Sequence, residues 1–574
     1  MIDRITKSYL KDFADKYSLT CDASEIFEHF VNYTLLDKFT QESHDFIDAN
    51  IGVDGTIGID GFGLIINDRF ISDVDEFIDI LDEKSKSNTA TVVFIQSKIA
   101  NEFSIKDINV FGTAAQDFIS GSPSLQWTEI AKTKIDLLDK LLDKSSKLVK
   151  RPSCYLYYVT LGNLNSDQNR EAIKNVIVDG IKAVNIFDDI KFEFLGAREI
   201  QERHKNIGNT IEKTFEFTKK LSLPTFDGIS EAYIGYISAK TLIDLITNEN
   251  GEIYSEIFFE NIRDYQGDKG VNSDIAQTLM SEYSSMFITM NNGITIISEE
   301  ISQQREIFTI RGFQIINGCQ TSHVIFNNKE SIKDNIDNIY IPVRIISTKV
   351  DVITERIIRA TNNQTVVKQQ DLIALTSFQK GLEDYFKARD LPVKLYYERK
   401  DKQYNRRSEI KEKFIINKTD LIKALTSCFD EKPHLATAFF GSIFSKYKDK
   451  YFKDEHSFSP YYLSSILLYY INEALRKPII DKKYKKIRFF ILMMLKYELN
   501  IDSNPQFNSK RIDEYVENII NLMDTDEKRE KIFNSIVRKL ESLESSKDIK
   551  FTNKDISKSP KLTELCKGLY RITR

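Results

Sequence analysis

The stretch Val92-Val93-Phe94-Ile95-Gln96-Ser97-Lys98, together with the earlier stretch Gly58-Ile59-Asp60-Gly61-Phe62, decides the fold of the first part of the chain. Both are β-branched or aromatic runs, and residues typical of turns precede each of them. The two stretches therefore predict two β-strands.

Strand geometry fixes which side chains of these stretches meet. Alternate residues of a strand share a face, so Gln96 and Lys98 point the same way and Ser97 points the opposite way. If the two strands pair, Asp60 comes near both Gln96 and Lys98. A carboxylate, an amide and an amine then share one place in the fold.

These three groups are the ones that a metal-dependent nuclease needs. An Asp with further oxygen ligands holds Mg²⁺ (or Mn²⁺), which can polarise a phosphodiester and lower the pKa of a bound water. We expect Asp60 to bind the metal, Gln96 to aid coordination, and Lys98 to assist the attacking water. Because the neutral oxygen of Gln96 is a weaker ligand than a carboxylate, a further acid is expected.

The first amphipathic helix offers that acid. Asp22-Ala23-Ser24-Glu25 has the pattern of a capping box, and an apolar stripe follows it at Phe27, Phe30, Val31 and Leu35. Glu25 is most simply a capping residue. Glu28 flanks the stripe, and it is either a solvated helix residue or a metal ligand; the sequence leaves both interpretations open.

The spacing Asp60, then Gln96-x-Lys98, resembles the PD-(D/E)xK nuclease superfamily, and specifically its Mrr-like branch, in which Gln replaces the acidic residue of the last motif. The predicted order is a helix, two strands, an apolar-periodic stretch at 108–119 and a long helix at 125–148, as such a core requires. The resemblance implies a restriction-endonuclease-like mixed-sheet core. It also implies catalytic roles for Asp60, Gln96, Lys98 and Glu28, with Asp60, Gln96 and Glu28 at the metal.

The length of 574 residues indicates about three domains. A strand at 153–161, a helix at 167–183 and a strand at 190–195 extend the first domain, which we assign to 1–210. A mixed α/β domain at 211–425 and an all-helical region at 426–574 follow, so the expected fold class is a multidomain α/β (α+β) protein. The helices of the last region are predicted at 461–475, 486–499, 512–523 and 526–543.

The cysteines and the apolar runs indicate the cellular compartment in which the protein is expected. Five cysteines are scattered without a C-x-x-C pair, which argues against a zinc site and against a disulfide framework, and indicates a reducing cytosol. The N-terminal residues contain no apolar run that could act as a signal peptide, and the best apolar windows are too short to span a bilayer. We expect a cytoplasmic protein without a membrane anchor.

The net charge of −5 does not indicate a nucleic-acid binder, but a nuclease needs only a local positive surface. Two segments could supply one. In residues 482–488 the charge run is more typical of a solvated face. In residues 394–407 tyrosines that can stack on bases alternate with cations that can bind phosphates, which favours nucleic-acid binding. We expect the nucleic acid to be DNA rather than RNA. The cations and tyrosines of this segment are Lys394, Tyr396, Tyr397, Arg399, Lys400, Lys402, Tyr404, Arg406 and Arg407.

Three clusters rich in amide side chains mark the second domain, at 290–295, 314–321 and 360–365. The middle cluster predicts a strand, a tight turn and the start of a helix, where backbone N–H groups can bind a phosphate or another anion. Its candidate ligands are Asn317, Gly318, Gln320 and Thr321, and those of the third cluster are Asn362, Asn363 and Gln364. The alternative is that Asn-Gly only makes the turn and that Thr321 or Ser322 caps the helix, and both interpretations stay open.

A series of motifs in this region looks like the AIPR family, the abortive-infection phage-resistance proteins of bacteria. The series runs Phe259-Glu260-Asn261-Ile262-Arg263-Asp264-Tyr265, Val271-Asn272, Asn291-Asn292-Gly293-Ile294-Thr295, Ile316-Asn317-Gly318-Cys319-Gln320-Thr321, Thr361-Asn362-Asn363-Gln364-Thr365 and Tyr397-Glu398-Arg399-Lys400. It covers about half of the chain, and six motifs in the family's order are specific. The resemblance implies a defence role against phage.

Two hypotheses of different classes follow. In the first, a Mg²⁺-dependent nuclease domain precedes an AIPR module that senses or holds a nucleic acid or nucleotide, with a phage-derived trigger. In the second, the protein is a non-catalytic sensor of nucleic acid or of a phage protein and acts by assembly. The helical region is expected to be a lid or a dimerisation platform, and a homodimer is expected.

Overall fold

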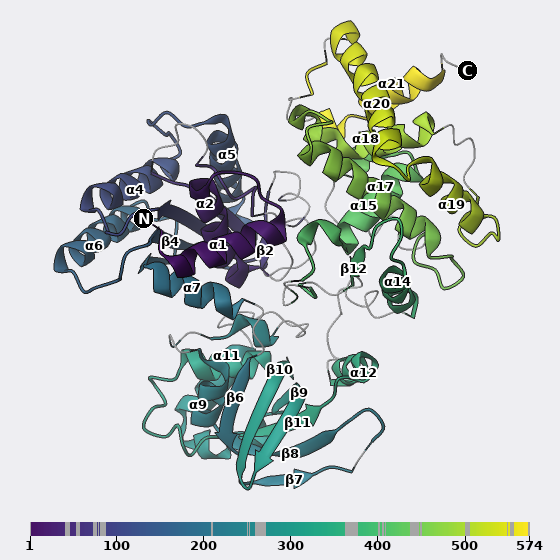
Figure 1. The fold of residues 1–574 in the computed structure, drawn as a ribbon. Coiled ribbons are helices and arrows are strands. Elements are labelled where there is room, and N and C mark those ends of the chain that lie inside the picture. Colours follow the sequence, from purple (N-terminus) through teal and green to yellow (C-terminus); the bar gives the residue numbers. More distant parts are fainter. Residues whose placement is uncertain are drawn as a thin grey trace.

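A computed structural model describes most of the chain. The described residues are 2–40, 46–52, 58–72, 77, 80, 88–207, 211–224, 226–248, 251, 253–258, 271–361, 377–399, 402–404, 407, 409–436, 443, 447, 450–499, 505–547, 549–551 and 556–571. They form three lobes, coloured purple to blue, teal, and green to yellow along the chain (Figure 1). The protein is therefore a multidomain chain of mixed α and β structure, as the sequence predicts.

The first lobe is a mixed sheet with helices on both faces. Its strands are β1 (Gly61–Ile66), β2 (Arg69–Phe70), β3 (Ala90–Lys98), β4 (Ser153–Thr160) and β5 (Asp189–Leu195). Its helices are α1 (Arg4–Tyr17), α2 (Ala23–Leu36), α4 (Ile105–Phe118), α5 (Glu129–Asp143), α6 (Gln168–Ala183) and α7 (Ala197–Asn206). Among the described residues the strand order is β2-β1-β3-β4-β5. β1 runs antiparallel to β2 and β3, and β3, β4 and β5 run parallel.

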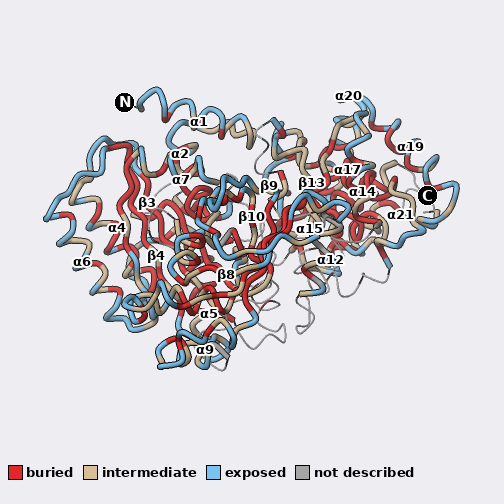
Figure 2. Tube along the Cα trace, turned by 90° about the horizontal axis from the view of Figure 1, so that it is seen from below, coloured by how far each residue is buried: buried red, intermediate tan, exposed pale blue. Residues whose placement is uncertain are grey.

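Strand alternation divides the core of this lobe into two layers. Val92 and Phe94 of β3 pack with α4, α5 and α6, whereas Val93 and Ile95 pack with α1, α2 and α7. Both faces of β3 are buried, and the exposed surface follows the outer sides of helices such as α6 (Figure 2). A strand covered on both faces needs the nearly continuous apolar run that its sequence shows.

The predicted elements of this lobe agree with the structure except at some ends. Strand β1 begins at Gly61, so Asp60 lies directly before the strand and not within it. Helix α5 is shorter than the predicted helix at 125–148, because the Thr128 side chain caps its start and the 3-10 turn Ser145–Lys147 follows its end. Asp22 caps α2 by accepting from the N–H groups of Ser24 and Glu25, as the pattern predicts.

The second lobe is built on a larger mixed sheet. Its strands are β6 (Glu212–Glu216), β7 (Lys220–Ser222), β8 (Glu231–Ser238), β9 (Ile294–Gln304), β10 (Ile307–Asn317) and β11 (Tyr340–Ser347). Its helices are α8 (Ala239–Ile246), α9 (Val271–Met280), α10 (Phe287–Met290), α11 (Cys319–Asn327) and α12 (Asp351–Thr361). Among the described residues the order is β6-β10-β9-β11-β8-β7, antiparallel except for β11 beside β9.

The third lobe is mainly helical. Its elements are α14 (Ser377–Ala388), β12 (Tyr396–Glu398), β13 (Ile415–Asn417), α15 (Lys418–Cys428), α17 (Ser459–Arg476), α18 (Arg488–Glu498), α19 (Ile512–Leu522), α20 (Asp526–Lys547) and α21 (Pro560–Arg571). The four helices predicted after residue 426 are confirmed in α17, α18, α19 and α20. Within the described residues no helix has both the length and the apolar character needed to cross a bilayer.

The hydrophobic core of the third lobe begins earlier than the expected boundary at 425/426. One continuous cluster of buried side chains extends from Phe378 to Tyr570. The expected boundary falls inside α15, and packing groups residues 377–425 with the helices rather than with the second sheet.

A lysine joins the third lobe to the first. Lys402 Nζ donates to Asp37 Oδ1 (2.8 Å), to the Asp37 carbonyl (3.0 Å) and to the Thr40 carbonyl (2.7 Å). Asp37 follows directly on α2, so the contact is made at the end of that helix. The side chains of Lys402 and Asp37 are each only 12% exposed, which reduces the screening of the ion pair by water.

This contact gives a test of how the lobes are held together. We predict that Lys402→Ala lowers the free energy of unfolding by about 1–3 kcal/mol, because it leaves a half-buried carboxylate and two carbonyl groups without their donor. Thermal unfolding followed by calorimetry measures the effect. Lys394→Ala is the matched control, since Lys394 pairs with Asp390 at the surface. Equal unfolding midpoints for the two variants would contradict a stabilising role of the contact.

Candidate functional site

Asp60 is held beside Gln96 by the pairing of β1 with β3. Gly61 pairs with Ile95, and the Asp60 N–H donates to the Ile95 carbonyl (2.9 Å), which puts Asp60 next to Gln96 across the strands. The Gln96 Nε2 group donates to Asp60 Oδ2 at 2.5 Å, and both residues are buried. The structure thus brings together the first two residues of the predicted site.

Ser97 binds the Asp60 carboxylate, which the sequence does not predict. Its N–H (2.8 Å) and its hydroxyl (3.2 Å) both donate to Asp60 Oδ2, although strand alternation predicts that its side chain lies on the opposite face from Gln96. Because Asp60 precedes β1, its carboxylate can reach the backbone at the end of β3. No hydrogen bond from a described residue reaches the other oxygen, Oδ1.

Burial and local charge act against each other on Asp60. Burial raises the pKa of this carboxyl above its ordinary value, and it outweighs the Lys98 charge and the hydrogen bonds from Ser97 and Gln96, which lower the pKa. A buried carboxylate that is hard to ionise is better compensated by a cation than by water.

Two buried amide side chains near Asp60 carry polar atoms without a hydrogen-bond partner among the described residues. Gln96 Oε1 has no donor among the described residues, and neither side-chain atom of Asn32 has a partner there, although the two residues are 1% and 0% exposed. Asn32 packs over Gly61, where an added Cβ would lie 2.1 Å from Asn32 Oδ1. Unsatisfied buried polar atoms are rare in proteins and often mark a water or an ion.

Glu28 lies on α2, and its side chain interacts with residues next to Asp60. Its Oε2 accepts from Asn50 Nδ2 (3.3 Å), and Asn50 is bridged to Gly61 on the side of β1 away from β3. Burial, and then the negative charge of Asp60, raise the pKa of Glu28 to about 7, against the opposing effects of Asn50 and Lys98. Glu28 is therefore a half-buried carboxyl within electrostatic range of Asp60, not a fully solvated helix residue.

Lys98 is exposed at the end of β3, two residues after Gln96 on the same face of the strand. Its charge lowers the pKa of both Asp60 and Glu28. All four predicted residues therefore lie in one neighbourhood.

The donor set fits a hard divalent cation. Asp60 Oδ1, the unpartnered Gln96 Oε1 and the Glu28 carboxyl offer only oxygen, the ligand that Mg²⁺ and Mn²⁺ prefer. Asn32 is not among the residues predicted from sequence. The pattern that could have identified it is a polar residue one turn after Glu28 within an apolar stripe.

The amide-rich clusters of the second lobe meet at one end of its sheet. Asn291 Nδ2 donates to Thr321 Oγ1 (3.1 Å), and Asn317 Nδ2 donates to the Thr361 carbonyl (3.0 Å). Gly318 has a φ of +93° and is the N-cap residue of α11, so no side chain caps this helix. The alternative that Thr321 or Ser322 caps the helix is therefore wrong. Gln320 is half-buried on the first turn of α11, and Asn362, Asn363 and Gln364 lie outside the described residues.

The described residues of the segment at 394–407 are less exposed than a nucleic-acid surface requires. Arg399 is 3% exposed and pairs with Glu383 (2.9 Å), and the rings of Tyr397 and Tyr404 are buried in the third lobe. Phosphate binding by Arg399 and base stacking by these two tyrosines do not fit this placement. Arg407 is exposed, whereas Lys400 and Arg406 lie outside the described residues.

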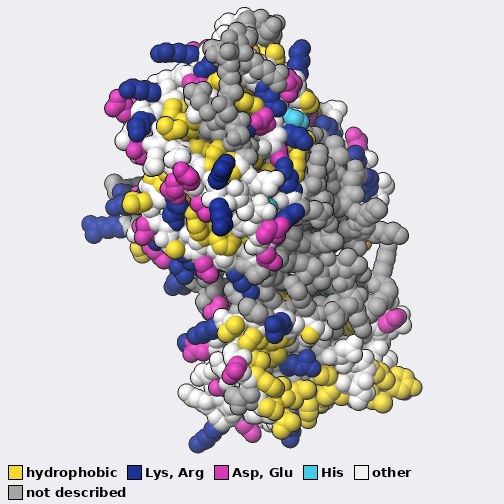
Figure 3. Space-filling model, turned by 90° about the vertical axis from the view of Figure 1, so that its right-hand side faces the viewer, with side chains coloured by type: hydrophobic (Ala, Val, Ile, Leu, Met, Phe, Trp, Pro, Cys, Tyr) yellow, Lys and Arg dark blue, Asp and Glu magenta, His cyan; other side chains and the backbone are white. Residues whose placement is uncertain are grey.

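The surface seen in Figure 3 carries charges of both signs. Lys and Arg side chains are interspersed with Asp and Glu over its upper part, and hydrophobic side chains gather on the lower lobe. In the second lobe, the exposed apolar side chains of neighbouring strands include the paired Leu221 and Ile234.

The raised pKa of Glu28 predicts a specific dependence of stability on pH. A carboxyl whose folded pKa lies above its ordinary 4.5 contributes stability below about pH 4.5, and this contribution is lost as the pH rises through about 7. Without metal, Glu28→Gln should match the wild type near pH 5 and exceed it at pH 8 by roughly 1–2 kcal/mol, after allowance for solvent screening. Urea unfolding in chelator at the two pH values measures the difference.

Asp117→Asn is the control for this prediction. Burial acts to raise the pKa of Asp117, but hydrogen bonds from Ser124, Trp127 and Leu125 prevail and lower it. Its carboxylate stays charged between pH 5 and 8, so the difference between this variant and the wild type should be constant there. A constant difference for Glu28→Gln as well would contradict the burial of Glu28.

Comparisons with known proteins identify one family. The family model described as AIPR protein matches residues 258–548, from the end of the 3-10 turn Ser255–Phe258 to the end of α20. No match was found among curated proteins or among solved structures. The matched region takes in β9, β10 and β11 of the second lobe and most of the third, while the Asp60 site lies outside it. The chain belongs to the AIPR family, and this membership supports a role in abortive-infection defence against phage.

Proposed function

We propose that the first lobe hydrolyses phosphodiester bonds in a reaction that depends on Mg²⁺ or Mn²⁺, and that this activity serves the defence role. The observation that carries the proposal is the buried Gln96 Oε1, which has no donor in the described part of the chain, beside the Asp60 carboxylate and with Lys98 on the same face of β3. A buried acceptor without a donor destabilises the fold unless a cation or a water satisfies it.

Asp60, Gln96 and Glu28 would hold the metal. When bound, the cation polarises the phosphodiester and lowers the pKa of a coordinated water. Asp60 is oriented by Ser97 and Gln96, which both donate to Oδ2, so Oδ1 would be the oxygen that binds the cation. Glu28, whose pKa is raised to about 7 in the metal-free protein, would release its proton on binding the cation.

Lys98 would act on the reacting phosphate. Its side chain is exposed, and its charge already acts on both carboxyls. An ammonium group at this place can orient the attacking water and stabilise the negative charge that develops on the phosphate oxygens. The substrate is proposed to be DNA in preference to RNA.

The second lobe would hold or sense a nucleic acid or nucleotide at the N-terminus of α11. Asn317, Gly318, Gln320 and Thr321 lie at this helix start, whose N–H groups favour an anion. In a homodimer triggered by a phage product, this module would control access to the first lobe. Among the described basic residues of 394–407, the exposed Arg407 would be the one to contact phosphate.

The second candidate function is that of a non-catalytic sensor. It is favoured by the convergence of the amide-rich clusters, which lie within or beside the region that the family model matches. In this case Asn317 and Gln320 would be essential, and Asp60 would serve only the fold.

The nuclease proposal predicts that Lys98→Ala lowers cleavage at least ~100-fold while the protein stays folded, because the Lys98 side chain is exposed and is not part of the buried core. Cleavage of plasmid DNA and of RNA is measured with Mg²⁺ and with chelator. Lys132→Ala, an exposed lysine of α5, is the matched control and should retain full activity.

Phage plating separates the two candidates in cells where the natural trigger is present. The nuclease proposal predicts that Asp60→Asn abolishes protection. Wild-type protection by Asp60→Asn, together with its loss in Asn317→Ala, would establish the sensor and contradict hydrolysis by the first lobe.

A further inference from the structure

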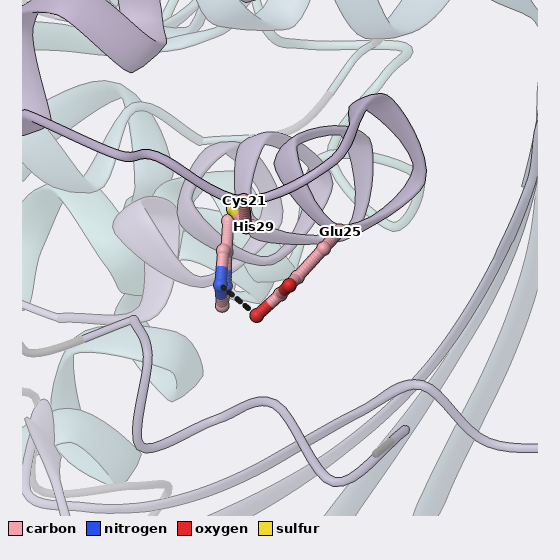
Figure 4. Close-up of side chains that lie close together, drawn as sticks. All are labelled: Cys21, Glu25 and His29. Atoms are coloured by element: carbon pink, nitrogen blue, oxygen red, sulfur yellow. Dashed lines mark ion pairs between the residues drawn. The ribbon is translucent and has the colours of Figure 1, made fainter. Parts of the chain in front are cut away.

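A second group of metal-binding side chains lies at the start of α2. Cys21, Glu25 and His29 follow one another at intervals of four residues, and each offers a ligand atom within 4.8 Å of the other two. The imidazole and the carboxylate point toward one another, and the thiol lies beside the imidazole (Figure 4). The scattered cysteines predicted no zinc site, because a C-x-x-C pair is absent and this mixed spacing of Cys, Glu and His differs from that pattern.

The cap of α2 and one ion pair determine the positions of Glu25 and His29. The Asp22 side chain caps α2 by accepting from the N–H groups of Ser24 (2.8 Å) and Glu25 (3.0 Å), so the first turn of the helix has a defined start. Glu25 Oε1 lies 3.6 Å from His29 Nε2, one turn further on. The His29 side chain is 5% exposed and packs against the Phe46 ring, whereas the Glu25 side chain is 50% exposed.

We propose that Cys21, Glu25 and His29 bind a zinc ion, with a water as the fourth ligand. A thiolate and an imidazole select zinc or a similar transition metal over Mg²⁺, which prefers oxygen alone. Ligand atoms on a tetrahedral zinc with bonds of about 2.0–2.3 Å lie roughly 3.3–3.8 Å apart. The 3.6 Å separation of Glu25 and His29 already meets this requirement.

The zinc site is separate from the site at Asp60 and does not depend on the nuclease proposal. Glu28, next to His29 in the chain, contacts Asn50 and interacts with Asp60, while Glu25 and His29 pair with each other. Zinc would tie the chain before α2 to the first two turns of the helix. The consequence is that α2 becomes harder to unfold, since binding to the folded state alone stabilises it.

Titration of the full chain with Zn²⁺ tests the proposal. The titration uses an Asp60→Asn background, so that metal bound at the other site does not contribute. We expect one equivalent of tightly bound Zn²⁺, and an at least tenfold weaker affinity in Cys21→Ser and in Glu25→Gln, both of which change side chains that are not fully buried. His456→Asn, a half-buried histidine of the third lobe, is the matched control and should bind as the background does.

Native-state alkylation gives a second measurement that does not rely on mutation. Cys21 is half-buried, and the other four cysteines are buried, so Cys21 should be the thiol modified in the folded protein. Zn²⁺ should protect it, and Mg²⁺ should not. The absence of a bound zinc ion, or equal binding and equal alkylation in the variants and the background, would overturn the proposal.

Discussion

The hydrogen bond between the Gln96 amide and the Asp60 carboxylate is the interaction on which the candidate site depends. It exists because β1 pairs with β3 in the register that sets Gly61 opposite Ile95. Burial of both residues removes the water that would otherwise satisfy them, so the carboxylate must be compensated from within the protein. The same burial raises the pKa of Asp60 and leaves Gln96 Oε1 without a donor among the described residues. Each of these properties makes the site a better receptor for a cation than a solvated carboxylate would be.

Helix α2 connects this site to two other features of the protein. Glu25 and His29 of the cluster lie in its first two turns, and Cys21 lies just before its start. Glu28 lies between Glu25 and His29 in the sequence, and Asp37, the residue after the end of the helix, accepts from Lys402 of the third lobe. The contact with the third lobe and the Cys21, Glu25 and His29 cluster therefore lie at the two ends of the helix that bears Glu28.

Much of the first lobe could be predicted from sequence because strand alternation is a local property. Gln96 and Lys98 share a face for that reason, and the apolar runs around them give the strands that the structure contains. The burial of Arg399 could not be predicted from local pattern, because its partner Glu383 lies on the preceding helix α14 and the alternation of tyrosines with cations resembles an exposed face. Asn32 and the unpartnered oxygen of Gln96 were missed because an orphaned polar atom is defined by its three-dimensional surroundings. In the second lobe, the turn at Gly318 was predicted, but its cap was not, because a glycine can begin a helix without any side-chain donor or acceptor.

Anomalous diffraction from crystals of the full chain grown with Mn²⁺ tests the central claim most directly. We expect an anomalous peak within about 2.0–2.6 Å of oxygen atoms from both Asp60 and Gln96, with the Glu28 carboxyl turned toward it. Mn²⁺ peaks confined to other parts of the molecule, together with a protein donor bonded to Gln96 Oε1, would contradict it.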